Sequence, residues 1–305
     1  MEFVHKSVLF DEAVKSLNVA NDKIYVDATA GGGGHSLEIS KNAGRLIAID
    51  QDPDAIKVLH ERLDGIGNIT IVQNNFVNIK SILQELGIDG IDGMLLDLGV
   101  SSFQLDTAER GFSYHKDAPL DMRMSKNGMS AADVVNTYSQ EELANIIYRY
   151  GEDKFSRRIA QNIVKAREIK PIETTLELVD IIKSAYPKAK MRDSHPARKT
   201  FQAIRIEVNG ELDKLSQTLD SALDCLNPGG RLSIITFHSL EDRMVKSAMN
   251  AAAKGCTCPP EFPVCVCGGK AKAKLVTRKP IEANTQELEE NRRSRSARLR
   301  VLEKL

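Results

Sequence analysis

The chain has few of the features that mark a membrane protein or a general polyanion binder. It contains no tryptophan and only 5% aromatic residues, and its 42 Lys and Arg residues balance 42 Asp and Glu residues. The molecule as a whole is therefore not a polycation. No apolar run approaches the ~18 residues that a membrane span needs, and the N-terminus lacks a signal-peptide pattern. We expect a cytoplasmic protein with one large domain or two ordinary ones.

Cysteine is scarce as well. Of the five cysteines, Cys225 stands alone, and the other four form two C-x-C pairs, Cys256 with Cys258 and Cys265 with Cys267. Zinc sites usually have C-x₂₋₄-C spacing, so these pairs match a metal site only weakly. The sequence leaves open a structural metal, reduced or redox-labile thiols, and disulfides, which a reducing cytoplasm disfavours. We assign no metal ligand from the sequence.

The most specific stretch runs from Asp27 to His35 and reads Asp-Ala-Thr-Ala-Gly-Gly-Gly-Gly-His. It follows a strand pattern at 23–26 and leads into a helical pattern, and its glycines let the backbone pass close to a ligand. Asp27 would repel a diphosphate, and Ser36 stands where a dinucleotide motif starting at Gly31 needs its last glycine. The pattern favours the acid-then-glycine loop of S-adenosylmethionine (SAM) enzymes. A plain glycine-rich turn is the alternative.

A second acid follows about 20 residues later, at the end of the strand pattern 44–50. This is where an α/β nucleotide-binding fold places the carboxylate that accepts the ribose hydroxyls. Pro53 suits the first helical position, which makes Asp52 the natural N-cap of a helix over 53–63. Asp50 is then available for the ribose. The alternative is that both acids only end a strand and cap a helix.

Strand and helix patterns continue to alternate along the chain. Two further strands are expected at 68–73 and 91–97, a helix at 79–86, and a fifth strand at 228–237 preceded by a helix over 201–226. This alternation predicts an α/β fold with a doubly wound, mostly parallel sheet. Ligands bind at the carboxyl ends of the strands in such sheets, so the glycine loop, Asp50, Phe76 and Asp97 should share one crevice.

Between the fourth and fifth strands the sequence looks like a helical insertion. A helix start at 139–142, a helix over 152–167 and another over 176–185 are expected there. From Arg149 to Arg205 fourteen Lys and Arg residues face seven Asp and Glu residues, and from Lys270 to the end eleven face five. Such local excess fits an anionic partner, although a charged stretch is more often a solvated face.

Six motifs together resemble the MraW family: Asp27–His35, Asp97–Gln104, Glu109–Ser113, Pro119–Met124, His195–Ala203 and Phe237–Arg243. The resemblance runs from His5 to Arg300, which is nearly the whole chain. It implies a class I, Rossmann-like SAM-dependent methyltransferase acting on the 4-amino group of a cytidine in the decoding region of small-subunit (16S) ribosomal RNA. It also implies a methyltransferase domain over 1–111 and 199–305, with an inserted helical RNA-recognition domain over 112–198.

The resemblance further implies the cofactor-binding residues. SAM would contact Gly33, Gly34 and His35 in the first loop. Asp50 would hold the ribose and Phe76 would lie near the adenine. Asp97 and Gln104 would complete the site. The implied partner is ribosomal RNA in the small subunit, with no membrane. A homodimer is compatible with the sequence, which does not fix the oligomeric state.

The catalytic residues must meet a chemical demand, because the amino nitrogen of cytosine is a poor nucleophile and needs hydrogen-bond acceptors and in-line placement. Other amino-methyltransferases carry Asn/Asp-Pro-Pro-aromatic after the fourth strand, whereas this chain continues from Asp97 with Leu-Gly-Val-Ser. We predict Asp97 and His238 as catalytic residues, with Asp242 as a further candidate near the crevice. A structural role is the alternative for His238.

Competing functions make different demands on the sequence. No cysteine lies in the stretch directly after the fourth strand, beside the expected cofactor crevice, so the covalent route of cytosine-5 methylation is not expected. The failed glycine fingerprint disfavours a dinucleotide oxidoreductase. A SAM-dependent methyltransferase of another RNA or of a protein would share the same sheet and loop, and it is the main alternative.

Overall fold

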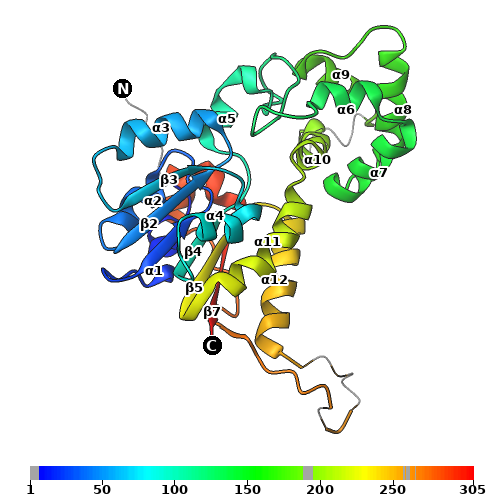
Figure 1. The fold of residues 1–305 in the computed structure, drawn as a ribbon. Coiled ribbons are helices and arrows are strands. Elements are labelled where there is room, and N and C mark those ends of the chain that lie inside the picture. Colours follow the sequence, from blue (N-terminus) through cyan, green and yellow to red (C-terminus); the bar gives the residue numbers. More distant parts are fainter. Residues whose placement is uncertain (1–6, 188–194, 257, 259–261, 265) are drawn as a thin grey trace. The chain divides into compact units, whose positions relative to one another are not determined.

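The computed structural model describes residues 7–187, 195–256, 258, 262–264 and 266–305. His5, where the family resemblance begins, and Cys265 lie outside these residues. The chain divides into two compact units, one formed by Met1–Gly99 with Asp213–Leu305 and the other by Val100–Leu212 (Figure 1). The expected domain boundaries at 112 and 198 both fall inside the second unit. Among the described helices, none is both long and apolar enough to cross a membrane.

The first unit is built on a seven-stranded sheet with the order β3-β2-β1-β4-β5-β7-β6. The first five strands run parallel, and β7 pairs antiparallel with both β5 and β6. The strand bounds are β1 (Ile24–Asp27), β2 (Arg45–Asp50), β3 (Ile69–Gln73), β4 (Ile91–Asp97), β5 (Leu226–Thr236), β6 (Ala273–Leu275) and β7 (Arg298–Lys304). The expected α/β fold with a mostly parallel sheet is confirmed.

Helices cover both faces of this sheet because side chains alternate along each strand. Val26 and Met94 point to one face, where they pack against α4 (Ile79–Glu85), α11 (Glu211–Cys225) and α12 (Ser239–Lys254). Tyr25 and Leu95 point to the other face, against α1 (Phe10–Leu17) and α2 (Gly34–Ser40). On that side α3 (Pro53–Leu63) packs beside Ala48. The sheet therefore has the two-sided burial typical of parallel sheets.

Local signals set several of these elements. The helix over 53–63 is confirmed as α3, with Pro53 at its start and the Asp52 side chain accepting from the Asp54 N–H at 3.0 Å. The single helix expected over 201–226 is wrong. Two helices occupy that stretch, α10 (Ala197–Asn209) and α11, because Gly210 adopts a left-handed conformation (φ 59°) that ends the first one.

The second unit is helical and has its own apolar core, formed by residues such as Val134, Ile147, Ile159 and Phe201. Its other elements are α5 (Ser102–Asp106), η2 (Ala108–Arg110), α6 (Ala131–Thr137), α7 (Gln140–Gly151), α8 (Ser156–Arg167) and α9 (Thr175–Ser184). The helix start expected at 139–142 and the helix expected over 176–185 are confirmed to within a residue, and both begin with a capping box.

One helix expected in this unit starts too early. The expected helix over 152–167 begins at Ser156 instead, because Glu152 has φ 49° and terminates α7. A residue with positive φ cannot continue a right-handed helix, so the chain makes a short break before α8. A lysine and two arginines, Lys154, Arg157 and Arg158, lie exposed at this break and at the start of α8.

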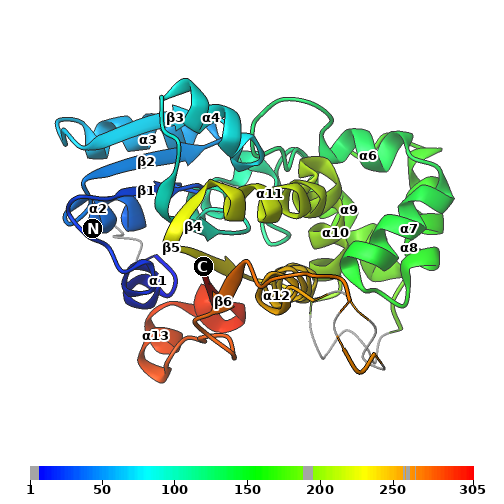
Figure 2. The ribbon, with the colours of Figure 1, turned by 60° about the horizontal axis from the view of Figure 1, so that its bottom comes forward.

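The C-terminal segment belongs to the first unit. It contains α13 (Thr285–Glu290) and the 3₁₀ helix η4 (Arg292–Ser296), followed by β7. In Figure 2 α13 lies beside α1, and Glu287 Oε1 accepts the Leu9 N–H at 2.7 Å although 278 residues separate the two. The remaining short 3₁₀ helix, η1 (Phe76–Asn78), precedes α4. The basic tail is thus a strand of the sheet, which sequence periodicity does not predict.

Candidate functional site

The glycine loop joins β1 to α2 and carries the first acid of the site. Asp27 is buried, and its two carboxylate oxygens accept from Ser36 Oγ at 2.6 Å and from the Thr29 N–H at 3.3 Å. Gly33 caps α2 with φ 77°, a conformation that favours glycine. A Cβ on Gly33 would also stand 3.0 Å from the Leu59 side chain. The loop is therefore held in shape by its acid and by a glycine whose left-handed backbone and close neighbour disfavour a larger residue.

Asp50 lies at the end of β2, as expected for a ribose-binding acid. Its Oδ2 accepts the Gly31 N–H at 2.8 Å and its Oδ1 accepts the Asp52 N–H at 2.8 Å. Each carboxylate oxygen has two lone pairs, so both oxygens keep capacity for a hydroxyl donor. Asp50 therefore links the glycine loop to the end of β2, and it can hold a diol at the same time.

Asp97 ends β4, which lies directly beside β1 where the strand order reverses. Its backbone N–H donates to Thr29 Oγ1 at 2.6 Å, which ties the strand end to the glycine loop. Among the described residues, its Oδ1 is buried and has no hydrogen-bond partner. A buried carboxylate oxygen without a donor is costly, so this atom is a vacant acceptor at the crevice where ligands bind in such sheets.

The acids of this unit influence one another. The pKa values of Asp27 and of Asp50 are raised to about 6, chiefly by burial, and the nearby Asp50 carboxylate contributes a smaller part of the shift at Asp27. Burial raises the pKa of Asp97 well above its usual range, and the carboxylates of Asp27 and Glu241 add to this shift. Like charges that are held together in a poorly solvated place favour a cationic ligand. The methyl sulfonium and the amino group of SAM are such cations, so the residues present fit SAM.

His35 is the second residue of α2 and is almost fully buried. Its ring stacks on Phe10 with a centroid distance of 5.7 Å, and its Nδ1 lies 3.8 Å from Asp97 Oδ2. Burial lowers the pKa of His35 to about 4, so the ring is neutral near pH 7. Its Nε2 is buried and has no hydrogen-bond partner among the described residues. The predicted cofactor residue thus lies next to the predicted catalytic acid.

Phe76 and Gln104, the other predicted cofactor-binding residues, have different surroundings from those of the acids. Phe76 begins η1 and is half-buried against the apolar core of the first unit, with Asn75 capping the turn. Gln104 belongs to the second unit, where its side chain accepts the Ser101 N–H at 3.1 Å in the capping box of α5. The two remain predictions as cofactor contacts, and Gln104 already has a local structural role.

The residues predicted after β5 have structural partners. His238 caps α12, with its Nδ1 accepting the Glu241 N–H at 3.4 Å, and Glu241 Oε2 accepts the Phe237 N–H at 2.8 Å. His238 Nε2 lies 3.1 Å from Glu241 Oε1 but is not aligned for a hydrogen bond. Asp242 accepts from Arg300 at 2.7 Å and from Arg298 at 3.2 Å. Asp97 is consequently the stronger catalytic candidate.

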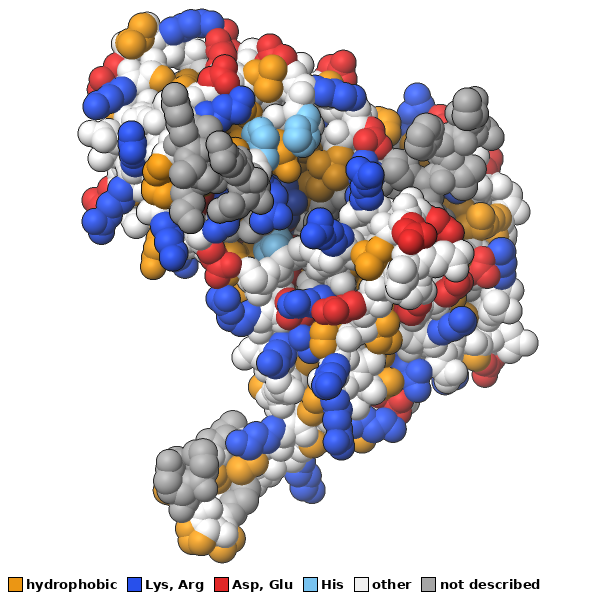
Figure 3. All heavy atoms as spheres, turned by 180° about the vertical axis from the view of Figure 1, so that it is seen from behind, with side chains coloured by type: hydrophobic (Ala, Val, Ile, Leu, Met, Phe, Trp, Pro, Cys, Tyr) orange, Lys and Arg blue, Asp and Glu red, His pale blue; other side chains and the backbone are white. Residues whose placement is uncertain are grey.

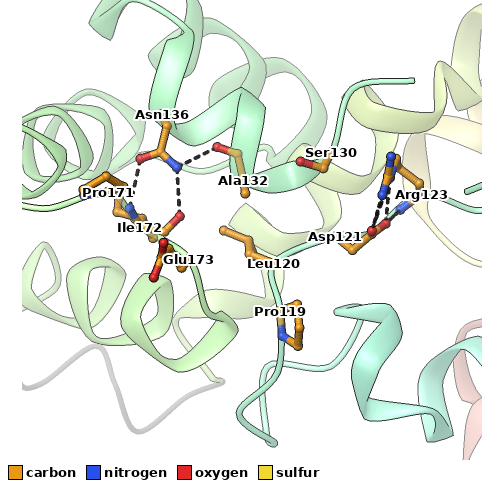
Figure 4. Close-up of a pocket in the computed structure, with 10 residues that line it drawn as sticks. All are labelled: Pro119, Leu120, Asp121, Arg123, Ser130, Ala132, Asn136, Pro171, Ile172 and Glu173. Atoms are coloured by element: carbon orange, nitrogen blue, oxygen red, sulfur yellow. Dashed lines mark hydrogen bonds and ion pairs between the residues drawn. The ribbon is translucent and has the colours of Figure 1, made fainter. Parts of the chain in front are cut away.

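A hollow of about 390 Å³ lies within the second unit (Figure 4). Asn136 spans it by donating to the Ala132 and Ile172 carbonyls and accepting the Ile172 N–H, all within 2.9 Å. At its edge Arg123 pairs with Asp121 at 2.6 Å. Asn136, Asp121 and Arg123 are thus engaged with other residues of the hollow or with its backbone, and none of the residues predicted for the site lines it.

The second unit also carries an aromatic cluster beside basic residues. Tyr114 packs on His115 and His195 with centroid distances of 4.4 and 4.7 Å, and the two histidines lie 5.4 Å apart. Figure 3 shows histidine side chains grouped together on one face, among Lys and Arg side chains. No sequence motif joins the members of this cluster, because about 80 residues separate His195 from the other two. Rings of this kind can stack on unpaired bases.

The strand order, the antiparallel β7 and the acids that follow β1, β2 and β4 together define a class I SAM-dependent methyltransferase fold. The model of the MraW methylase family matches residues 2–305. The chain belongs to this family. The family membership expected from the sequence motifs is confirmed.

Relatives from several bacteria are similar over the whole length. "Ribosomal RNA small subunit methyltransferase H" of Clostridium botulinum is 57% identical over 100% of both chains, and the protein of the same name from Finegoldia magna is 54% identical over 100% of both. "Ribosomal RNA small subunit methyltransferase H 2" of Agathobacter rectalis is 58% identical over 100% of this chain and 99% of its own. The solved structure of an rRNA methylase from Streptococcus thermophilus aligns with 99% of this chain and 99% of its own, at 13% sequence identity and a TM-score of 0.46.

Proposed function

We propose that this chain transfers a methyl group from SAM to the 4-amino group of a cytidine in the decoding region of small-subunit ribosomal RNA. The observation that carries the proposal is the buried Asp97 Oδ1, which has no hydrogen-bond partner among the described residues and ends the strand beside the glycine loop. An amino group is the donor that such an acceptor suits. The names of the full-length relatives support RNA of the small subunit as the substrate.

When bound, SAM supplies an electrophilic methyl group on a sulfonium. The glycine loop and Asp50 hold the cofactor, with Gly33 and Gly34 giving close backbone approach and Asp50 accepting the ribose hydroxyls. His35 stays neutral and lines the same place. These acids stabilise the positive charge on the sulfur of SAM, and the reaction removes that charge. They therefore favour binding of SAM over binding of the product, whose sulfur is neutral.

Asp97 acts on the base. Its carboxylate accepts an N–H of the cytosine amino group, which orients the nitrogen and makes its lone pair available for in-line attack on the methyl group. The new N–C bond forms as the C–S bond breaks, and the electron pair of that bond goes to sulfur. The amino group then loses one proton, which the Asp97 carboxylate accepts. The route needs no cysteine and no covalent bond between enzyme and RNA.

The second unit holds the RNA in this proposal. Lys154, Arg157, Arg158 and Lys165 are exposed on and just before α8, where they can contact phosphates. The cluster of Tyr114, His115 and His195 offers rings for stacking on a base that is unpaired or flipped out. Because ribosomal RNA is the substrate, we place the protein in the cytoplasm. A homodimer is compatible with the proposal, and the reaction does not require one.

Nucleoside mapping by mass spectrometry tests the proposal. Ribosomal RNA from cells without the gene should lack one 4-methylated cytidine, and the wild-type gene should restore it while the Asp97→Asn gene should not. Assays on free RNA and on assembled small subunits then identify which of the two is methylated. A 5-methyl product, or covalent trapping of the enzyme by RNA with 5-fluorocytidine, would contradict the mechanism. An unchanged RNA would favour another RNA or a protein as the substrate.

A further inference from the structure

Three cysteine sulfurs meet in the segment that connects α12 to β6. The Sγ atoms of Cys256, Cys258 and Cys267 all lie within 4.8 Å of one another, although the first and last are eleven residues apart in the chain. The segment begins where α12 ends at Lys254 and is followed by β6 (Figure 2). It belongs to the first unit, and the proposed methyl transfer uses none of these thiols.

The distance between two of the sulfurs distinguishes a shared metal from a disulfide. Cys256 Sγ and Cys267 Sγ are 3.8 Å apart. A disulfide bond is about 2.05 Å long, so this pair is not bonded. Tetrahedral zinc with Zn–S bonds of about 2.3 Å sets its sulfur ligands about 3.8 Å apart. The observed separation matches that of two ligands on one zinc ion, and it is also a normal contact distance for two thiols.

Backbone N–H groups point at the same sulfurs. Cys258 Sγ accepts from the N–H groups of Val266 and Cys267, both at 3.3 Å, and Cys267 Sγ accepts from the Gly269 N–H at 3.4 Å. Converging backbone N–H groups stabilise negative charge on a ligand, and they are the outer contacts of many metal–thiolate centres. The chain therefore supports the sulfurs in the way that a metal site requires.

The segment between α12 and β6 has little packing of its own to stabilise it. Among its described residues the large apolar side chains do not form a core, since Phe262, Val264 and Val266 are 52, 70 and 72% exposed. At its base the Lys272 N–H donates to the Ala252 carbonyl at 2.9 Å, which joins its end to α12. Small units without an apolar core are usually stabilised by disulfides or by a metal. In a reducing cytoplasm a metal is the stable choice.

We propose that Cys256, Cys258 and Cys267 bind a structural Zn²⁺ ion that fixes this segment. Thiolates are soft ligands and select zinc over hard cations such as Mg²⁺. The weak C-x-C spacing is compensated by the fold, which brings Cys267 back to the first pair. The sequence offers Cys265 as a fourth thiol, and this residue lies outside the described part of the chain. The site is distinct from the crevice at the ends of β1, β2 and β4, and its role is not catalytic.

Metal content is the direct test. The full-length protein, purified under reducing conditions and dialysed, should contain one zinc per chain by plasma mass spectrometry. Cys258→Ala should weaken zinc binding by more than about tenfold. Cys225→Ala is the matched control, because Cys225 lies on α11 away from the cluster and should retain full zinc.

Cobalt gives a readout that does not depend on any variant being folded. Wild-type protein stripped of metal and loaded with Co²⁺ should show thiolate-to-metal charge-transfer absorption and the strong visible bands of tetrahedral coordination. Zinc should quench this spectrum as it displaces cobalt, and it should protect the segment from limited proteolysis. Absence of zinc together with a Co²⁺ spectrum of the hexa-aquo ion would overturn the proposal. So would an iron–sulfur cluster or a disulfide found in the freshly purified protein.

Discussion

The two units of the chain place charge in opposite ways. In the first unit Asp27 is buried and Asp50 and Asp97 are partly buried, and burial together with neighbouring carboxylates raises the pKa values of all three. In the second unit Lys154, Arg157 and Arg158 are exposed on a helical surface. A small cationic cofactor needs few charges in a fixed, poorly solvated geometry. A large polyanion needs many exposed charges, each of which contributes little.

The C-terminal segment shows why the sign of the charge alone is not enough. By sequence it has the same kind of basic excess as the second unit. In the structure Arg300 is buried against Asp242, and Lys304 Nζ donates to the carbonyls of Asp224 and Leu226. Lys274 pairs with Glu303 at 2.7 Å. These basic side chains hold a strand in place, so a basic composition does not by itself make an RNA-binding surface.

The largest effect is expected at Asp97. Asp97→Asn keeps the shape of the side chain and removes the negative charge, so the rate of methyl transfer at saturating SAM and RNA should fall by about 10²–10³-fold. Single-turnover assays measure this rate. SAM and RNA affinities, measured in parallel, should change much less. A loss of less than tenfold would move the catalytic assignment to another residue of the crevice.

Asp50 should affect binding rather than chemistry. Asp50→Ala removes charge-assisted hydrogen bonds to the ribose, so SAM binding should weaken by about 2–3 kcal/mol, or roughly 30–150-fold. Calorimetric titration measures the change. Asp52→Asn is the matched control, because asparagine caps α3 equally well and the affinity should stay near that of the wild type. Equal losses in both variants would remove the ribose role of Asp50.

Much of the first unit can be predicted from local sequence. The bounds of α3 follow from Asp52 and Pro53, and the strands ending in Asp50 and Asp97 agree with their sequence patterns to within a residue or two. The features that the sequence does not predict depend on long-range contacts. Phe10 stacks on His35 across 25 residues, and the Arg300–Asp242 pair spans 58 residues. No periodicity within a short window carries such information.

Binding of SAM should depend on pH because of the raised pKa values. Asp27 and Asp50 titrate at about 6 in the folded chain, against a usual value of 3.8. Between about pH 4 and pH 6 the folded state retains protons that the unfolded state has lost, so ligand-free stability falls by about 1.4 kcal/mol per group and pH unit as pH rises. A cationic ligand favours the ionised carboxylates and offsets this loss. SAM affinity should therefore rise by up to about tenfold from pH 5 to pH 7.

The demethylated product provides the control for this prediction. S-adenosylhomocysteine lacks the sulfonium charge but fills the same space, so its affinity should change less over the same range. The His35 ring does not confuse the measurement, because its pKa is lowered to about 4 and it stays neutral in this window. Identical pH profiles for the two ligands would show that the acids do not respond to the charge on sulfur.

A smaller effect is expected on RNA binding from the second unit. Replacing both Arg157 and Arg158 with alanine should weaken RNA binding by several-fold, and it should lower the slope of log K against log salt by roughly one unit for each phosphate that the variant no longer neutralises. SAM affinity should not change. Lys80→Ala is a suitable control, since Lys80 is an exposed basic residue of the first unit that pairs with Asp224 at 2.7 Å. An unchanged salt slope would mean that the two arginines are only solvent-exposed charges on α8 and do not contact RNA.

The smallest effect should come from Arg298, and it separates the two basic regions. Its side chain is 45% exposed and pairs with Asp242 and Glu282, both at 3.2 Å. Exposed ion pairs contribute little, so Arg298→Ala should lower the free energy of unfolding by no more than about 1 kcal/mol. Because this charge is already engaged within its own unit, the salt slope of RNA binding should stay at the wild-type value. A slope reduced as much as in the Arg157/Arg158 variant would make the C-terminal strand part of the RNA-binding surface, and the division of charge between the units would then be wrong.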